Sequence, residues 1–404
     1  MDGHKQAIVL SGGGAYGAYE IGVMKALFQG HCPATGHLCL DPQIFTGTSV
    51  GAVNATFMIS QPETDLVSTI EQLESIWINR FAENSNNCGN GVFRFRGNPI
   101  EFFDPNCVLR HPLTPVTQVL DDSVFFTRDL LARSADFVFS TQSLQLRTIG
   151  LFNVADLVSI EPLQSTVASI VNLEGVRRSQ RFLVVAATHW DNGRLALFTN
   201  KDLTDAFGHQ ILMASAAIPG IFPPARVGGH VFVDGGVIMN TPLLPAIRAG
   251  ADVIHVVYLD PNVADIPLQR LQNTIDTFDR LTVIQWAAKA NEDIETVRWV
   301  NMGIAALQKA AVTSEKQARD ILRVLGPLQE KMTEGKSYRH ITVHRYHPRE
   351  DLGGPLGMLN FARSQIEGLI QKGFEDAINH NCDESECILP EPMISQEPSM
   401  AAPS

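Results

Sequence analysis

The sequence predicts an α/β protein in which a layered sheet of mostly parallel strands is flanked by helices, followed by a mainly helical C-terminal portion. Short apolar runs alternate with segments of helical periodicity, which is the pattern of an α/β fold. Glycine-rich turns follow several of these runs. The chain has 404 residues, of which 45% are apolar and 18% charged, so it is long and apolar enough to bury a large core.

The first sixty residues predict a strand, a glycine loop, a helix, a short strand, a tight turn and a second helix. Residues 7–10 form an apolar run that ends at Ser-Gly-Gly-Gly, as expected of a buried parallel strand. Residues 19–28 carry apolar side chains at helical spacing and predict a helix packed on the sheet. Residues 45–55 then combine a short strand, the turn Gly-Thr-Ser-Val-Gly and the start of a helix.

Later segments continue the same pattern. Two β-rich runs, 181–188 and 194–199, flank Asp-Asn-Gly and predict a hairpin. Further strands are expected at 231–233 and 253–259, and helices over most of 267–332 and over 360–378.

These elements suggest three parts of the chain. We expect a core domain over residues 5–260, with an irregular insertion or lid at 84–115 where Asn, Gly, Pro, Phe and Arg accumulate. A mainly helical extension packed on the core is expected over 261–379, and a disordered tail over 380–404.

Charge and cysteine usage limit the partners of the protein. The formal charge of −12 argues against nucleic acid, which requires clustered cations, and any membrane contact must then be local or hydrophobic. Without a visible signal peptide or an apolar run of ~18 residues, we expect a cytoplasmic protein, peripheral at membranes. The six cysteines are then expected to be reduced. Cys382 and Cys387 are spaced more widely than a usual zinc pair and no second pair accompanies them, so no metal site is predicted.

The loop Gly12-Gly13-Gly14-Ala15-Tyr16-Gly17 follows a predicted strand and opens a predicted helix. Glycines there allow backbone amides to turn into a cavity and bind an anion, either a phosphate or a developing oxyanion. The same letters match the G-x-G-x-x-G pattern of dinucleotide-binding proteins, with Asp41 at a plausible distance for a ribose contact. The loop alone therefore leaves nucleotide binding and acyl transfer open.

A second glycine turn favours acyl transfer. Ser49 lies between Gly47 and Gly51 in the G-x-S-x-G pattern of a nucleophile elbow, a turn to which a dinucleotide-binding fold gives no role. An acidic residue, Asp234, ends the apolar run 231–233 and is followed by two further glycines. This carboxylate is expected at the sheet edge where loops gather, although an Asp-Gly pair is also a common solvent-facing turn.

Together with the block Ala-Ser-Ala-Ala-Ile-Pro-Gly-Ile-Phe-Pro-Pro at 214–224 and Asn-Thr-Pro at 240–242, these motifs resemble the patatin-like phospholipase family over residues 6–259. The resemblance implies a serine–aspartate dyad, with Ser49 as nucleophile and Asp234 as its base. It also implies no cofactor and no metal, a lipid or lipid-like ester as substrate, and transient contact with a membrane surface. Oligomeric state is left unknown. The remaining site residues that it implies are the oxyanion-hole glycines Gly12, Gly13 and Gly14 and the supporting motif glycines Gly17, Gly47, Gly51, Gly235 and Gly236.

Several alternatives remain at this stage. The family often has Lys or Arg where this chain has Tyr16, which leaves headgroup preference open. A histidine could serve as base in place of the aspartate, but the elbow lies too near the N-terminus for an α/β-hydrolase. The histidines in or beside strand-like segments are His189, His255, His344 and His347. A catalytically silent member of the family that binds lipid is a third alternative.

The segment Phe93-Arg94-Phe95-Arg96 alternates aromatic and basic side chains, with Phe102 and Phe103 close behind. One interpretation is a flap that touches membranes, where aromatics insert and arginines meet phosphates. The alternation equally fits a half-buried strand with one solvated face, and this is the interpretation that we favour.

Overall fold

The fold is built on an eight-stranded mixed sheet. The computed structural model describes residues 4–61, 65–84, 89–97, 109, 114–139, 157–259, 274–313, 340–350, 352–353 and 357–389. The strand order is β10-β9-β1-β2-β5-β8-β7, with β6 also paired to β5. The bounds of these strands are β1 Gln6–Leu10, β2 Ile44–Thr48, β5 Phe182–His189, β6 Leu195–Thr199, β7 Ala225–Val227, β8 His230–Asp234, β9 Val253–Val257 and β10 Thr342–Tyr346.

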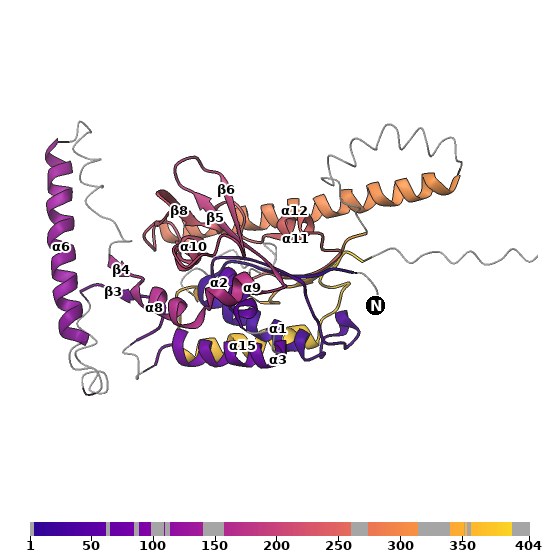
Figure 1. Ribbon diagram of the computed structural model, residues 1–404, viewed down its shortest axis with the longest axis horizontal. Coiled ribbons are helices and arrows are strands. Elements are labelled where there is room, and N and C mark those ends of the chain that lie inside the picture. The colour runs from indigo at the N-terminus through magenta and orange to yellow at the C-terminus, as the bar shows by residue number, and fades with distance from the viewer. Residues whose placement is uncertain are drawn as a thin grey trace, which may run out of the picture.

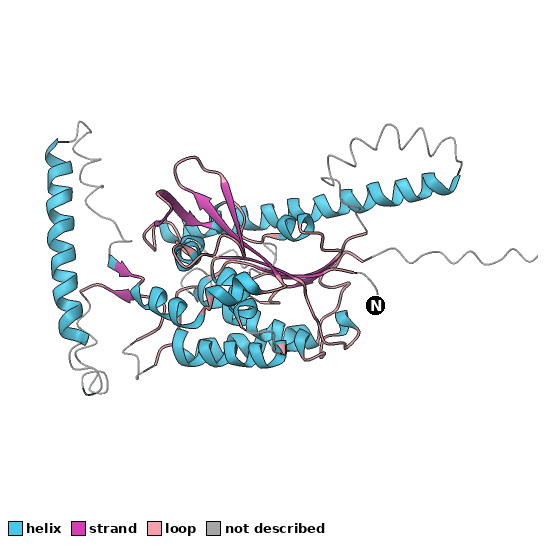
Figure 2. Ribbon diagram, in the orientation of Figure 1, coloured by secondary structure: helices cyan, strands magenta, loops and turns pink. Residues whose placement is uncertain are grey.

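The five strands β10, β9, β1, β2 and β5 run parallel, whereas β6 and β8 pair antiparallel with β5, and β7 pairs antiparallel with β8. The predicted α/β class with a mostly parallel sheet is therefore confirmed. Strands and helices alternate along most of the chain, and helical layers cover the sheet (Figure 2).

Helices cover both faces of the sheet. The side chains of β1 alternate between the two faces, and each face has its own core. Ile8 and Leu10 belong to the core beneath α1, α2, α3 and α15, and Ala7 and Val9 to the core beneath α11 and α12. In Figure 1, α12 runs along one side of the sheet while α1, α3 and α15 lie along the opposite side. These helices are α1 Gly17–Phe28, α2 Val50–Ser60, α3 Leu66–Ile76, α11 Leu243–Arg248, α12 Thr274–Thr313 and α15 Arg363–Ile378.

Smaller elements connect this framework. A π-helical turn, Trp77–Phe81, extends α3, and α8, α9 and α10 contribute to the same core as α1. Their bounds are α8 Glu161–Ile170, α9 Leu173–Arg178 and α10 Gly208–Ser215. The predicted hairpin is confirmed as β5 and β6, whose turn contains Gly193 with a φ of 63°.

The segment at 93–96 is a half-buried strand rather than an exposed flap. Arg94 and Phe95 form β3, which pairs antiparallel with β4, Val158–Ser159. Asp122 of α6 (Thr114–Phe139) accepts two hydrogen bonds from the buried Arg94 guanidinium, at 2.9 and 3.0 Å, and one from Arg96 at 3.4 Å. Both arginines therefore face a carboxylate within the protein. Phe102, Phe103 and most of the rest of the predicted lid lie outside the described residues.

The C-terminal portion, expected as a mainly helical extension packed on the core, also contributes a strand to the central sheet. β10 extends the central sheet beside β9, and α15 packs along α1 within the main core. The predicted helix at 360–378 is confirmed as α15, and α12 confirms the described part of the helical stretch expected over 267–332. Residues 380–389, expected in a disordered tail, form turns, and Ile388 exchanges two backbone hydrogen bonds of 2.9 Å with Val343 of β10.

Candidate active site

The glycine loop and Ser49 meet because the strands that carry them are parallel neighbours. β1 pairs with β2 in the register Leu10↔Gly47, so both strands end at the same edge of the sheet. The glycine loop follows β1 directly, and Ser49 follows β2 directly. A Cβ atom at Gly12 would lie 3.0 Å from the Ser49 Cβ, so the two loops touch.

Ser49 has the strained backbone of a nucleophile elbow. Its φ of 54° and ψ of −125° are rare for a residue with a side chain, and the residue is buried at the N-terminus of α2. Position 47 requires glycine, because a Cβ atom there would overlap the carbonyl oxygen of Gly51. Gly51 itself packs against the carbonyl oxygens of Leu10 and Ser11. The motif thus turns the chain sharply from β2 into α2, with Ser49 at the bend.

Asp234 reaches the same edge from a strand that is not adjacent to β2. β5 lies between β2 and β8, with the registers Thr48↔Ala186 and Ala187↔Asp234. After Asp234 the chain crosses over the end of β5, where a Cβ atom at Gly235 would lie 2.5 Å from the Ala186 carbonyl oxygen and 2.9 Å from Thr48 Cγ2. Only glycine allows this close approach, which brings the Asp234 loop against the end of β2.

The Asp234 carboxyl group is buried, and burial raises its pKa from 3.8 to about 7. Its Oδ1 atom accepts a hydrogen bond of 2.7 Å from the Gly236 amide. Its Oδ2 atom has no hydrogen bond of standard geometry within the described part of the chain. The Ser49 hydroxyl is nevertheless close enough to lower this pKa, as does the Gly236 amide, although burial outweighs both. The structure therefore brings the two predicted dyad residues together.

The block at 214–224 holds both members of this pair. The Ser215 hydroxyl accepts a hydrogen bond of 2.9 Å from the Ser49 amide and donates one of 2.7 Å to the Ala186 carbonyl oxygen. Two residues on, the Ala217 carbonyl oxygen accepts a hydrogen bond of 2.9 Å from the Asp234 amide. Sequence reasoning used this block only as a sign of resemblance and missed its role in fixing the elbow.

Replacing Ser215 with alanine is expected to loosen the elbow without removing a reacting group. The Ser49 amide loses its acceptor, and we expect kcat to fall about tenfold and the melting temperature to drop, as for the loss of one buried hydrogen bond. The measurement is steady-state ester hydrolysis together with a thermal melt. Ser159→Ala, at another buried serine, is the matched control and should retain kcat. An unchanged kcat in Ser215→Ala would contradict this role.

The Asn-Thr-Pro motif at 240–242 positions the glycine loop. Gly12 and Asn240 are joined by two hydrogen bonds of 3.1 Å, from the Gly12 amide to the Asn240 carbonyl oxygen and from Asn240 Nδ2 to the Gly12 carbonyl oxygen. The Thr241 and Ser11 hydroxyls lie 2.8 Å apart. The predicted set of oxyanion donors changes as a result. The Gly12 amide is already used within the fold, whereas the amides of Gly13 and Gly14 have no acceptor among the described residues.

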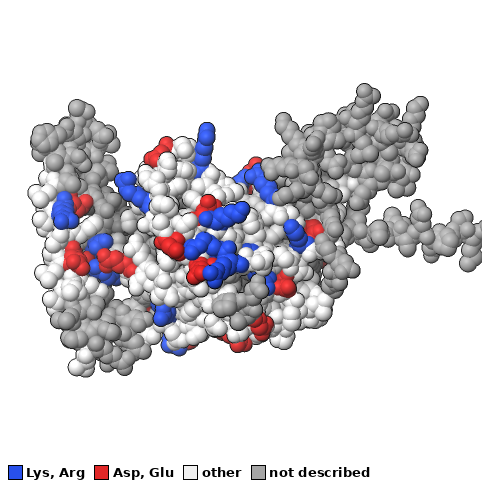
Figure 3. Space-filling view, viewed as in Figure 1, with Lys and Arg blue, Asp and Glu red and all other residues white. Residues whose placement is uncertain are grey.

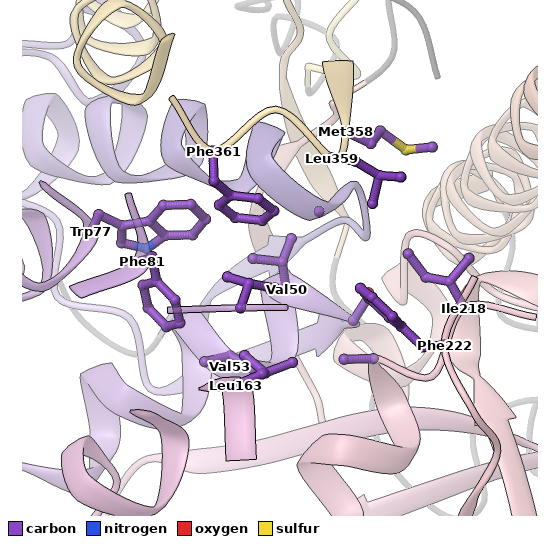
Figure 4. A pocket seen from close by; sticks show the side chains of 14 residues that line it. Val50, Val53, Trp77, Phe81, Leu163, Ile218, Phe222, Met358, Leu359 and Phe361 are labelled. Carbon is purple, nitrogen blue, oxygen red and sulfur yellow. The ribbon is translucent and has the colours of Figure 1, made fainter. Parts of the chain in front are cut away.

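An apolar pocket opens beside Ser49. The pocket and the open solvent at its entrance together amount to about 470 Å³ of space free of protein atoms. Figure 4 shows Trp77, Phe81 and Phe361 along one side of the pocket and Ile218 and Phe222 along the other. The segment at 358–361 also covers the glycine loop, because the Ala15 amide donates a hydrogen bond of 2.8 Å to the Met358 carbonyl oxygen. The full lining consists of Gly14, Ser49, Val50, Val53, Trp77, Phe81, Val92, Leu163, Ala216, Ile218, Phe222, Met358, Leu359 and Phe361.

A buried polar network fixes the Trp77 ring in this lining. The Trp77 indole donates a hydrogen bond of 2.9 Å to Asn54 Oδ1, and Asn54 Nδ2 donates one of 2.8 Å to the Glu20 carboxyl group. Burial raises the pKa of Glu20 well above its usual value. Gly17, the last glycine of the loop, faces Val50 and Trp77.

The geometry supports neither a dinucleotide site at the glycine loop nor a histidine as the base. Asp41 precedes β2, so it lies at the opposite edge of the sheet from the glycine loop, where it pairs with Arg181 at 2.7 Å. It cannot contact a ribose bound at that loop. In the described part of the chain no histidine is hydrogen-bonded to Ser49 or Asp234. Tyr16 is buried with its hydroxyl against Gly353 and Gly357 rather than in the pocket.

The surface shows no large basic area on the face drawn in Figure 3. Among the described side chains of that face, Lys and Arg alternate with Asp and Glu. This mixture of both signs on one face is compatible with the net charge of −12. None of the described helices is long and apolar enough to cross a bilayer.

Comparison with known proteins agrees with the resemblance drawn from the motifs. The family model described as patatin-like phospholipase matches residues 8–247, more than half of the 404-residue chain. A crystal structure of VipD from Legionella pneumophila aligns with 92% of this chain and 67% of that chain, at 15% identity and a TM-score of 0.32. An alignment this weak identifies neither fold nor function. The family match spans the glycine loop, the elbow and the aspartate loop, and the chain therefore belongs to the patatin-like phospholipase family, a family of lipid acyl hydrolases.

Proposed function

We propose that this protein is a phospholipase A-like or lysophospholipase-like lipid acyl hydrolase that cleaves carboxylic esters through an acyl-enzyme on Ser49. One observation carries the proposal: a strained serine that lines an apolar pocket lies beside a buried carboxylate of raised pKa. The apolar pocket offers a binding site for an acyl chain, and Ser49 and Asp234 offer the nucleophile and the base that ester cleavage requires. Family membership supports the same reaction class.

In the first half of the reaction, the Asp234 carboxylate accepts the Ser49 proton while Ser49 Oγ attacks the ester carbonyl carbon. The Gly13 and Gly14 amides donate hydrogen bonds to the resulting oxyanion. Collapse of the tetrahedral intermediate breaks the bond to the alcohol, and protonated Asp234 returns the proton to the leaving oxygen. The fatty acyl group is now esterified to Ser49.

In the second half, the Asp234 carboxylate accepts a proton from water, whose oxygen attacks the acyl-enzyme carbonyl. The same amides stabilise the second oxyanion. Collapse releases the fatty acid, and the proton on Asp234 passes to Ser49 Oγ. A pKa of about 7 suits this exchange, because Asp234 must accept and donate a proton in each half-reaction at neutral pH.

The substrate is expected to place its acyl chain along the pocket, with its carbonyl carbon at Ser49. Val53 lies in the lining and is buried, on the helix that follows Ser49. Filling the pocket with Val53→Trp should therefore exclude long chains. Since each buried CH₂ contributes ~0.8 kcal/mol, loss of two or three methylene sites should lower kcat/KM for long-chain esters by about 10- to 50-fold.

The measurement is kcat/KM for a series of ester chain lengths, with a thermal melt to verify folding. A butyryl ester measured on the same variant is the internal control and should lose less than about threefold, because the substituted ring need not meet so short a chain. A uniform loss at every chain length, in a protein that melts normally, would contradict the assignment of the pocket to the acyl chain.

The function itself is tested by fatty acid release from a panel of phospholipids, lysophospholipids, galactolipids and simple esters. Release from at least one long-chain lipid by wild type, absent from Ser49→Ala, is the expected result. A folded wild-type protein that binds lipid vesicles but releases no acid from any member of the panel would replace this proposal with the catalytically silent alternative.

A further inference from the structure

Four metal-ligating side chains converge on the edge of the sheet away from the catalytic loops. His344 lies in β10, whereas His380, Cys382 and Cys387 lie in the turns that follow α15. Their ligand atoms all lie within 4.8 Å of one another. β9 and β1 separate β10 from β2, the strand that leads to Ser49. The catalytic proposal therefore uses none of these four residues.

Three sulfur–nitrogen distances within this group fit the edges of a coordination tetrahedron. Cys382 Sγ lies 3.5 Å from His344 Nδ1 and 3.6 Å from His380 Nε2, and Cys387 Sγ lies 3.4 Å from His380 Nε2. In a tetrahedral zinc site with bonds of ~2.3 Å to sulfur and ~2.05 Å to nitrogen, a sulfur and a nitrogen ligand are separated by roughly 3.6 Å. These three pairs of atoms are therefore already at the spacing of a tetrahedral zinc site, and the remaining pairs lie within 4.8 Å.

The surroundings hold the ligands in place. The rings of His255 and Tyr346 pack on those of His344 and His380, with centroids 4.9 and 4.5 Å apart. Both ligand histidines are buried.

Backbone contacts fix the two thiols. The Cys387 amide donates a hydrogen bond of 2.9 Å to the Cys382 carbonyl oxygen, which closes the turn between them. The Arg345 amide points at Cys387 Sγ at 3.3 Å, as amides do toward metal-bound thiolates.

We propose that His344, His380, Cys382 and Cys387 bind a structural zinc ion. Two thiolates and two imidazoles in a tetrahedron select zinc over the oxygen-seeking Mg²⁺ and Ca²⁺. All four positions are filled by protein, which is the arrangement of a structural rather than a catalytic site. The ion would tie the turns at 380–387 to the edge strand β10. Sequence reasoning found no second pair beside Cys382 and Cys387, because His344 is brought there only by folding.

The first test measures metal on the full-length wild-type protein, purified without chelator. We expect about one zinc ion per chain by elemental analysis. After removal of the metal, titration with Co²⁺ should give the visible absorption of tetrahedral cobalt together with a thiolate charge-transfer band. Because these measurements need no variant, they do not depend on whether a substituted protein folds. Substoichiometric zinc in wild type together with a cobalt spectrum lacking the thiolate band would overturn the proposal, as would a Cys382–Cys387 disulfide found by mass spectrometry.

The second test assigns the ligands. Cys382→Ser and Cys387→Ser are each expected to lose the bound zinc, whereas Cys39→Ser, at an exposed free cysteine, should retain it. A chelator should lower the melting temperature of wild type and of Cys39→Ser but not that of Cys382→Ser. Retention of full zinc by both ligand variants would overturn the assignment. Ser49 labelling by a fluorophosphonate reports separately on the catalytic proposal.

Discussion

Ester hydrolysis by Ser49→Ala is expected to fall on the order of a million-fold, as on loss of the nucleophile in other serine hydrolases. The reason is that Ser49 Oγ forms the acyl-enzyme in the proposed mechanism, and no other described hydroxyl lines the pocket. The protein should fold normally, because alanine removes only this oxygen. The measurement is fatty acid release together with loss of fluorophosphonate labelling.

Ser60→Ala is the matched control for this experiment. Ser60 is a buried serine of the same helix, whose hydroxyl donates to the Phe57 carbonyl oxygen at 2.8 Å, and its substitution should leave hydrolysis intact. Residual hydrolysis by purified Ser49→Ala above about a thousandth of wild type would show that another nucleophile is used.

Asp234→Asn is expected to lower kcat about 100- to 10,000-fold, the usual contribution of a general base. The same substitution should stabilise the protein at about pH 8. The folded-state pKa of about 7 lies above the ordinary value of 3.8, so stability from the protonated carboxyl group is fully present below the lower value and is lost as pH rises through about 7. Asparagine cannot ionise, and we expect the free energy of unfolding at about pH 8 to rise by about 1–4 kcal/mol.

Activity and stability should therefore move in opposite directions in this variant, which separates a catalytic role from a structural one. Asp252→Asn, at another buried carboxylate, is the matched control and should keep its activity. Full activity in purified Asp234→Asn would remove Asp234 as the base.

Much of the site could be predicted because each motif describes a local backbone requirement. In the turn Gly47-Thr48-Ser49-Val50-Gly51, both glycines lie so close to neighbouring backbone atoms that a side chain would overlap them. The same holds for Gly235, where the chain crosses the end of β5 after Asp234. The pairing of Ser49 with Asp234 rested on family resemblance, since no local pattern reveals that β8 joins the sheet beside β5. That contact depends on strand order, which is a property of the whole fold.

Features that depend on distant contacts were missed for the same reason. The sequence predicts the Gly12 amide as an oxyanion donor, but in the structure this amide donates to the Asn240 carbonyl oxygen, so the proposal rests on Gly13 and Gly14. The pocket is lined in part by Met358, Leu359 and Phe361, which the sequence analysis placed in the helical extension and not in the core domain. The Asn-Thr-Pro motif, which closely follows the predicted base Asp234 in the sequence, was the available signal for the first of these.

The claim that Asp234 activates Ser49 is tested most directly by the rate of fluorophosphonate labelling of Ser49, mapped by mass spectrometry, between about pH 5 and pH 9. In wild type the rate should rise with pH along a single titration curve with a midpoint near 7, the pKa of Asp234. In Asp234→Asn the rate should be low and lack that midpoint. A wild-type rate without an inflection near 7, or the same profile in Asp234→Asn, would contradict the account.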